Sequence, residues 1–207
     1  MTRLLVATRN RKKLDELHRI LVSIDLGAVE LLTLADVPEY EEVPETGATF
    51  EENALLKARE GARHTGLVTV ADDSGLAVDA LNGMPGVLSA RWSGGHGDDA
   101  ANLDLLLAQI SDVPAERRGA AFVCAAALVT PDGGEEVVVG RVDGTLTSEP
   151  RGDGGFGYDP IFVPTGHSRT TAEMPAEEKD QLSHRGRALR ALAGPLTTAL
   201  ATSTGAN

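Results

Sequence analysis

The sequence predicts an α/β fold built on a long mixed β-sheet that is flanked by helices. Helix and strand patterns alternate in the first half of the 207-residue chain, which is typical of parallel β–α units. The second half holds two long apolar stretches joined by a turn sequence, which indicates an antiparallel pair. No linker rich in proline, glycine or serine divides the chain, so we expect one domain over residues 1–201 and a disordered tail over residues 202–207.

The first half is expected to contain three strands and two helices. Asn10 can cap the first helix, in which apolar residues recur at helical spacing. The segment from Thr49 to Glu52 has the pattern of a capping box, and it predicts a second helix that runs to about His64. The acidic segment 36–46 contains two prolines and is expected to be a loop. The expected strands are 3–7, 29–34 and 67–71.

The second half is expected to pair two long strands beside two further helices. Glycine and turn residues dominate segment 79–97, after which Asp98 or Asp99 can cap a helix. The turn at 131–134, Pro-Asp-Gly-Gly, is a strong hairpin signal. The expected strands are 120–130, 135–147 and 160–163, and the last helix is expected over residues 183–200, with a kink at Gly194-Pro195.

The composition excludes several classes of function. A net charge of −12 and a pI of about 4.8 give a field that repels nucleic acid, so we expect no nucleic-acid partner. A small anionic ligand remains compatible if basic residues or a metal are concentrated in one place. Cys124 is the single cysteine and lies in an apolar stretch, so we expect a buried thiol and a reducing, cytoplasmic setting. No apolar run has the length of a signal peptide or a bilayer span, so no membrane partner is expected.

The first candidate site is the polar segment between the first strand and the first helix. A helix N-terminus offers N–H groups and a positive dipole to a phosphate, and Thr8 and Asn10 can add side-chain donors. Lys13 adds a positive charge one turn later. The same residues also fit an ordinary helix cap followed by a solvated basic face, and both interpretations stay open. The candidate phosphate-binding residues are Thr8, Arg9, Asn10, Arg11, Lys12 and Lys13.

A second candidate site is the pair of aspartates that follows the apolar run 67–71, where we expect a strand to end. The adjacent carboxylates of Asp72 and Asp73 raise each other's free energy, and a divalent cation relieves this cost. One carboxylate can hold Mg²⁺ while it or its neighbour takes a proton from water. Asp and Ser at a strand end, with Ser74 next in sequence, can instead cap a turn.

The segment around the second helix can contribute to this site. Glu45 can reach a metal that the aspartates hold. Asn53 and Lys57 are four residues apart and therefore lie on one face of the helix. Alternatively, Glu45 belongs to a solvated acidic loop and Lys57 to an exposed helix face.

A third candidate site contains an aromatic ring between glycines. A nucleobase can approach Phe156 and stack on it, an interaction worth about 1–3 kcal/mol. Asp159 can accept a hydrogen bond from a base N–H. A separate candidate is Lys179 with Ser183-His184-Arg185-Gly186, in which the two adjacent donors, His184 and Arg185, can contact a base carbonyl or a phosphate. Phe156 can equally be packed into the core, and the two residues that begin the last helix can simply be exposed to solvent.

The order and spacing of these motifs resemble the non-canonical purine nucleoside triphosphate pyrophosphatases, also called inosine/xanthosine triphosphate pyrophosphatases. The resemblance covers nearly the whole chain, from Thr8 to about Leu192. The motifs that carry it are Thr8-x-Asn10-x-x-Lys13, Glu45-Thr46-Gly47-x-Thr49-Phe50-x-Glu52-Asn53-Ala54, Ala71-Asp72-Asp73-Ser74-Gly75-Leu76, Phe156-Gly157-Tyr158-Asp159-Pro160 and Ser183-His184-Arg185-Gly186.

The resemblance implies two lobes around the sheet with a central nucleotide-binding cleft, a homodimer, and one or more Mg²⁺ ions per subunit. By position, Glu45 and Asp73 would hold Mg²⁺, Asp73 would be the proton acceptor, and Ser74 would contact substrate. The triphosphate would be bound by the segment from Thr8 to Lys13, with Lys57 nearby. The base would be bound by Phe156, Gly157, Tyr158, Asp159, Lys179, His184 and Arg185.

The implied activity is hydrolysis of ITP, dITP and XTP to the nucleoside monophosphate and pyrophosphate, which removes them from the nucleotide pool. A pocket that donates to a 6-oxo group would leave its donors unpaired opposite the 6-amino group of adenine, so adenine nucleotides should be rejected. The alternatives are a pyrophosphatase for other modified nucleotides and a nucleotide-binding sensor without turnover. Clustered acids facing a triphosphate argue against the sensor, because binding alone does not need them.

Overall fold

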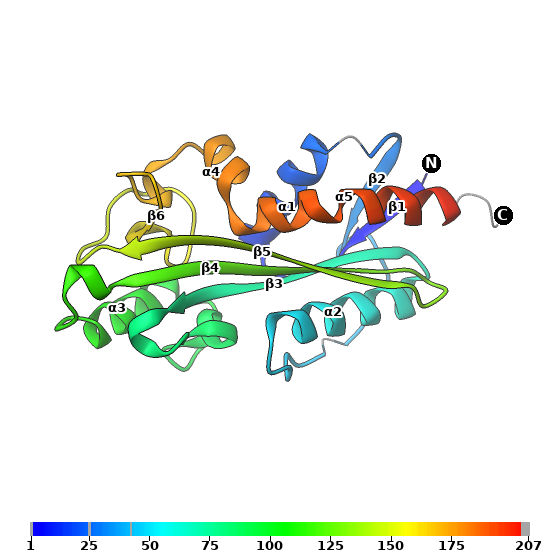
Figure 1. Cartoon of the computed structure of the whole chain (residues 1–207). Helices are drawn as coiled ribbons and strands as arrows, with labels where there is room; N and C mark the ends of the chain where they lie inside the picture. The colour runs from blue at the N-terminus through cyan, green and yellow to red at the C-terminus, as the bar shows by residue number, and fades with distance from the viewer. Residues whose placement is uncertain (1, 25, 42, 204–207) are drawn as a thin grey trace. The chain divides into compact units, whose positions relative to one another are not determined.

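Six strands form one mixed sheet in the order β2-β1-β3-β4-β5-β6 (Figure 1). This architecture comes from a computed structural model that describes residues 2–24, 26–41 and 43–203. β1 is parallel to both β2 and β3, whereas β5 is antiparallel to β6, so the predicted mixed α/β sheet is confirmed. The strands are β1 (Thr2–Val6), β2 (Val29–Thr33), β3 (Val68–Val78), β4 (Gly119–Val129), β5 (Glu135–Leu146) and β6 (Phe162–Pro164).

The chain divides into two units, and neither is a continuous segment. Unit 1 consists of Met1–Asp73, Cys124–Gly140 and Arg185–Asn207, and unit 2 consists of Ser74–Val123 and Arg141–His184. Because the divisions fall within or next to strands and a helix rather than in linkers, composition along the sequence does not mark them.

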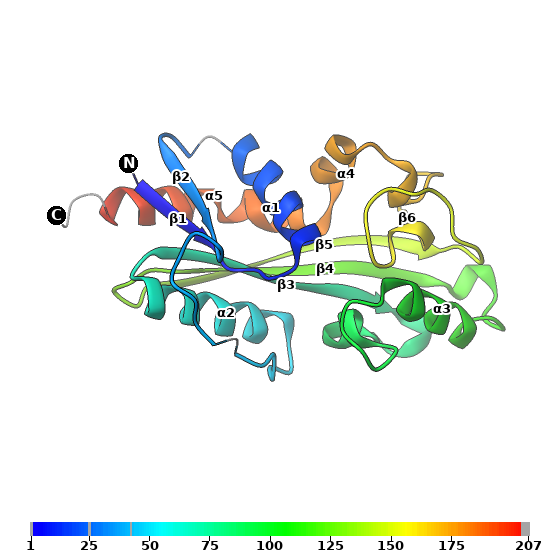
Figure 2. The ribbon, with the colours of Figure 1, turned by 180° about the vertical axis from the view of Figure 1, so that it is seen from behind.

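Three helices cover the two faces of the sheet in unit 1. Leu4 and Val6 of β1 point to one face, where α1 and α5 pack, and Leu5 points to the other face, against α2 (Figures 1 and 2). This alternation follows from the period of two residues in a strand, and burial on both faces explains the unbroken apolar run from Leu4 to Val6. The helices are α1 (Arg11–Ser23), α2 (Phe50–Thr65) and α5 (His184–Ser203).

The predicted ends of these helices are largely confirmed. The Asn10 side chain accepts from the N–H groups of Lys12 and Lys13 at the start of α1, and Thr49 caps α2. Gly66 ends α2 with φ +66°, a left-handed conformation that glycine adopts at low cost. α5 continues past Pro195 to Ser203, so the expected tail does not begin at 202, and residues 204–207 lie outside the described part.

Unit 2 has its own apolar core around the far half of β3. Leu76 and Val78 pack with Leu106 of α3 and with Phe122 and Phe162. Asp98, rather than its neighbour, caps α3. The helix α4 was not predicted, because seven residues are too few to show apolar periodicity. The helices of this unit are α3 (Asp99–Gln109) and α4 (Ala176–Leu182), with short 3₁₀ turns at Asp79–Leu81, Gly86–Arg91, Ala115–Arg117, Asp159–Ile161 and Thr171–Glu173.

The prediction that a strand ends at Ala71 is wrong. β3 continues through the aspartates and Gly75 to Val78, eleven residues in all. The polar residues interrupt the apolar pattern that marks a buried strand, yet the ladder continues, because backbone pairing does not depend on side-chain polarity. The aspartates therefore lie in the interior of a strand, where their side chains are more rigidly held than in a turn. Among the described helices, none combines the length and apolar character needed to cross a bilayer.

Candidate active site

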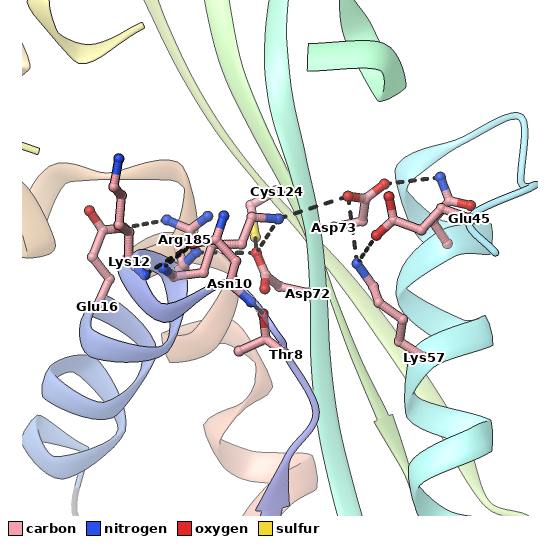
Figure 3. A network of polar contacts seen from close by, with 12 residues as sticks. Thr8, Asn10, Lys12, Glu16, Glu45, Lys57, Asp72, Asp73, Cys124 and Arg185 are labelled. Atoms are coloured by element: carbon pink, nitrogen blue, oxygen red, sulfur yellow. Dashed lines mark hydrogen bonds and ion pairs between the residues drawn. The ribbon is translucent and has the colours of Figure 1, made fainter. Parts of the chain in front are cut away.

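Charged side chains of unit 1 alternate in sign around the two aspartates of β3. Figure 3 shows Lys57 and Glu45 on one side of Asp73, and Arg185 and Glu16 beyond Asp72. Each cation of the series contacts carboxylates on both sides of it, so the cluster is a continuous network. In order along the network, the residues are Glu16, Arg185, Asp72, Lys13, Asp73, Lys57 and Glu45.

Asp73 has the surroundings of a proton acceptor. Its Oδ2 accepts a hydrogen bond of 3.0 Å from the Asn53 amide, and its Oδ1 lies 3.9 Å from Lys13 Nζ and 3.7 Å from Lys57 Nζ. Burial raises the pKa of Asp73 above its ordinary value, and the two lysines offset this only in part. The carboxylate is therefore oriented by one amide and is more basic than an exposed aspartate.

Asp72, the next residue along β3, is in a different environment. Its Oδ2 lies 3.2 Å from Arg185 Nε and 3.5 Å from Lys13 Nζ, and the Cys124 thiol, which is buried as predicted, lies 3.8 Å away. Burial opposes ionisation, but these positive charges outweigh it and hold the pKa of Asp72 well below its usual range. The Asp72 Oδ1 atom is buried and has no hydrogen-bond partner among the described residues. Asp72 is therefore a fixed anion, and only Asp73 is suited to exchange a proton.

Lys57 joins Glu45 to Asp73. Its Nζ lies 2.6 Å from Glu45 Oε1 as well as 3.7 Å from Asp73. Burial lowers the pKa of Lys57, but the charges of Asp73, Asp72 and Glu45 outweigh burial and raise it overall, so the ammonium stays charged. The alternative of an exposed Lys57 on a solvated helix face is therefore wrong.

The side chains that could act as metal ligands limit the kind of metal site that the cluster can form. Glu45 and Asp73 converge on the same ammonium, and no group of three or more His, Cys, Asp and Glu ligands occurs within the described ranges. Mg²⁺ is typically held by one or two carboxylates together with substrate phosphates and water. Two convergent carboxylates fit a magnesium ion that a phosphate helps to bind, and they do not fit a cage made of protein ligands alone.

The segment from Thr8 to Lys13 is a helix cap as well as a source of charge. Asn10 Oδ1 accepts from the N–H groups of residues 12 and 13 at 3.0 and 3.2 Å, so these two N–H groups are already used. Arg9 turns aside and donates to the Tyr40 carbonyl at 2.9 Å. Of this segment, Lys13 is the residue that lies beside the aspartates, while Arg11 and Lys12 are exposed. Phosphate binding by the segment stays a prediction.

In unit 2, Asp159 organises the loop that carries the aromatic ring. Its Oδ2 accepts from the Phe156 N–H at 2.8 Å and from Lys179 Nζ at 2.5 Å, and its Oδ1 accepts from the Thr171 hydroxyl at 2.7 Å. The Lys179 ammonium also lies 5.1 Å from the centre of the Phe156 ring, which is a cation–π distance. Gly155 has φ +69°, and a Cβ there would lie 2.0 Å from Asp159 Oδ2. Asp159 therefore fixes the loop, and its expected contact with a base stays a prediction.

The other predicted base-binding residues have separate surroundings. Tyr158 is buried in the core of unit 2, and its hydroxyl donates to the Ser89 carbonyl at 2.9 Å. His184 is buried and stacks on the Phe122 ring, with centroids 4.8 Å apart and planes at 11°. Arg185 belongs to the acid network of unit 1. The alternative that His184 and Arg185 are simply exposed to solvent is wrong, because both are buried. Direct contacts of these residues, of Gly157 and of Ser74 with substrate stay predictions.

Sequence reasoning missed three residues that support these clusters. Glu16 is buried on the core face of α1 and pairs with Arg185. Its place directly before Leu17 and four residues before Ile20, on the apolar stripe, was a usable signal. Asp99 and Thr171 contact the loop around Phe156 because the fold brings them close to it. No local sequence pattern indicates these contacts.

The fold and the acid–lysine cluster together describe an α/β protein with a phosphate- and metal-compatible site on a mixed sheet. The model of the Ham1 family matches residues 4–194, and the chain belongs to this family. The dITP/XTP pyrophosphatase of Mycobacteroides abscessus is 70% identical over 190 residues, which are 92% of each chain. The enzyme of the same name from Nocardia farcinica is 65% identical over 201 residues, 97% of each chain. The solved structure of the Ham1 protein of Staphylococcus aureus is 36% identical, with a TM-score of 0.83 over 95% of this chain and 99% of that one. The resemblance inferred from the motifs is thus confirmed at the level of the family.

Proposed function

We propose that this chain hydrolyses the non-canonical purine nucleoside triphosphates ITP, dITP and XTP to the nucleoside monophosphate and pyrophosphate. The observation that carries the proposal is the buried Asp73 carboxylate, held by Asn53 and flanked by Lys13 and Lys57. The names of relatives that are 65–70% identical over nearly the full length support the same reaction. By clearing these nucleotides, the chain would keep them out of the nucleotide pool.

The acid–lysine cluster of unit 1 is suited to the phosphate chemistry. Asp73 takes a proton from a water molecule, whose oxygen forms a bond to the α-phosphorus while the bond from that phosphorus to the bridging oxygen breaks. The ammonium groups of Lys13 and Lys57 stabilise the negative charge that grows on the departing pyrophosphate. Asp72 keeps Lys13 in place from the other side. The positive charge needed for a tetra-anionic substrate is thus concentrated locally in an acidic protein.

Magnesium is part of the proposal. Glu45 and Asp73 would hold the ion, and when bound it would neutralise phosphate charge and lower the pKa of coordinated water. Asn53 contributes by orienting the Asp73 carboxylate, so that Oδ1 remains directed toward the lysines.

The loop around Phe156 in unit 2 is suited to a purine base. The ring offers a stacking surface beside the Lys179 ammonium, which also donates to Asp159. Donors that meet the 6-oxo group of hypoxanthine or xanthine would be left unpaired by the 6-amino group of adenine. This cost predicts strong rejection of adenine nucleotides. We further propose that the chain acts as a cytoplasmic homodimer, which sedimentation can test.

A substrate panel tests the proposal. Wild-type protein with Mg²⁺ is given ITP, dITP, XTP, dATP and GTP, and pyrophosphate release is measured through a coupled inorganic pyrophosphatase. We expect turnover of the first three and little of dATP, whose 6-amino group would leave the donors unpaired. Equal turnover of all five would refute the base assignment, and absence of turnover with ITP, dITP and XTP would refute the function.

A matched pair of variants tests the role of Asp73. Asp73→Asn should lower kcat by about 10²–10⁴-fold, the usual contribution of a general base, while binding of ITP is retained. Asp104→Asn, which removes the charge of an exposed aspartate on α3, should leave turnover unchanged. An Asp73→Asn variant with wild-type turnover would show that this carboxylate is not the proton acceptor.

A further inference from the structure

Two residues outside the predicted site hold the loop from Gly155 to Asp159 at two separate points. Asp99, at the start of α3, accepts from the Gly157 N–H through Oδ2 at 3.2 Å. Thr171 donates to Asp159 Oδ1 at 2.7 Å and to the Asp159 carbonyl at 3.2 Å. One contact therefore fixes the backbone just after Phe156, and the other fixes the carboxylate that accepts from the Phe156 N–H.

The residues immediately before them have different tasks. Asp98 caps α3 by accepting from the Ala101 N–H at 3.0 Å. The Thr170 hydroxyl donates to the Arg151 carbonyl at 2.8 Å, and Thr170 forms a capping box at the next 3₁₀ turn. Asp99 and Thr171 are thus each preceded by a residue of the same type. Asp98 and Thr170 stabilise the same region through hydrogen bonds to residues other than 155–159.

The loop needs such support because of its composition. Gly155 and Gly157 have φ values of +69° and +59°, and glycine backbones lose the most conformational freedom on ordering. A stacking surface binds tightly only when its position is set before the ligand arrives, since otherwise binding must also order it. The ring of Phe156 is tied to this backbone, so its position depends on whatever restrains the loop.

We propose that Asp99 and Thr171 are positioning residues that set the affinity for the purine base by fixing the loop of Phe156 in advance. The inference deepens the proposed function and rests on it, because it assumes that this loop binds the base. It makes one distinctive claim: loss of either contact weakens recognition of the base and leaves recognition of the phosphates unchanged.

Binding and kinetics with separate probes for the two ends of the substrate test this claim. The probes are inosine monophosphate, whose binding is measured by calorimetry, and inorganic tripolyphosphate, a base-free inhibitor of the Mg²⁺-loaded enzyme. Asp99→Ala and Thr171→Val should each weaken binding of inosine monophosphate and raise the KM for ITP by about two- to tenfold, the usual effect of one lost hydrogen bond. The kcat and the inhibition constant of tripolyphosphate should stay within twofold of wild type. Asp99→Asn and Thr171→Ser, which keep the acceptor and the donor, should restore both parameters.

The neighbouring residues provide the controls. Asp98→Ala and Thr170→Val should lower the melting temperature without a change in affinity for inosine monophosphate. Unchanged affinity in both Asp99→Ala and Thr171→Val would overturn the inference, as would an equal weakening of tripolyphosphate inhibition. If wild type binds inosine monophosphate but turns over no triphosphate, the proposed reaction fails while the affinities still decide the positioning role.

Discussion

Replacing Arg185 with methionine tests whether the network behind the aspartates is electrostatically balanced. The guanidinium is 1% exposed and contacts both Asp72, which is 0% exposed, and Glu16, which is 4% exposed. Arg185→Met keeps much of the volume but removes the guanidinium that both buried carboxylates contact, while Lys13 stays 3.5 Å from Asp72. Breaking a buried ion pair from one side typically costs about 3–5 kcal/mol. That is a large share of a total stability of about 5–15 kcal/mol.

Urea unfolding at neutral pH measures this cost. Arg187→Met removes the same side chain from an exposed position two residues further along α5, and it should change stability by less than about 0.5 kcal/mol. A loss for Arg185→Met no larger than that of Arg187→Met would refute the reasoning. In a Glu16→Gln background the Arg185→Met cost should shrink by about 0.5–3 kcal/mol, because one of the two carboxylates that the guanidinium contacts is already neutral.

The difference in the free energy of unfolding between wild type and Arg185→Met depends on pH, and the sign of this dependence can be derived. The pKa of Asp72 is depressed in the folded wild type, so its stabilising contribution is present above the ordinary carboxyl pKa and is lost as the pH falls toward the folded value. The charge of Lys13 remains in Arg185→Met, but the carboxylate loses the charge and the hydrogen bond of Arg185, so it can be protonated more easily. The difference in the free energy of unfolding between wild type and Arg185→Met should therefore become smaller as the pH falls below about 5, near the ordinary carboxyl range. A difference that becomes larger on acidification would contradict the conclusion that Arg185 stabilises an ionised Asp72.

Three further outcomes are expected. EDTA should abolish pyrophosphate release and Mg²⁺ should restore it; turnover that resists chelation would refute the metal requirement. Gly155→Ala should lower stability and weaken inosine monophosphate binding more than Gly157→Ala does, because a Cβ at residue 155 meets Asp159 whereas one at residue 157 meets nothing within 4 Å; equal effects in calorimetry would show that only the positive φ matters. Thr49→Ala should cost about 1 kcal/mol in urea unfolding by removing the cap of α2, and Thr49→Ser should cost little; equal losses would mean that the hydroxyl is not the stabilising group.

Features that depend on neighbours in the sequence were predicted well. Asn10 and Thr49 cap the helices they were expected to cap, and the turn at 131–134 joins two long strands. These features depend on hydrogen bonds within four residues and on backbone conformations that one residue type favours, so the local sequence contains the information. The motif order was equally informative, since it identified the family before any geometry was known.

Features that depend on distant segments were predicted in part or wrongly. β3 runs through its aspartates to Val78, although its pairing with β1 ends at Val70. Its other neighbour in the sheet is β4, eleven residues long and distant in the sequence, which no local pattern reports. Local sequence also assigned Lys179, His184 and Arg185 to one cluster, although Lys179 contacts Asp159 whereas Arg185 pairs with Asp72. The helix α5 begins at His184, between Lys179 and Arg185 in the sequence. The direction in which each of these two side chains points follows from packing and not from sequence spacing.

The sequence by itself determined the α/β class, the helix ends, and which residue types were available for phosphate, metal and base. Only the tertiary structure decided how Asp72 and Asp73 differ. Adjacent residues of a strand point to opposite faces, so Asp72 meets Arg185 and a buried thiol whereas Asp73 meets Asn53 and Lys57. Identical carboxyl groups thereby acquire pKa values that shift in opposite directions. The physical reason is that charge and burial act through space, over distances that residue numbers do not encode.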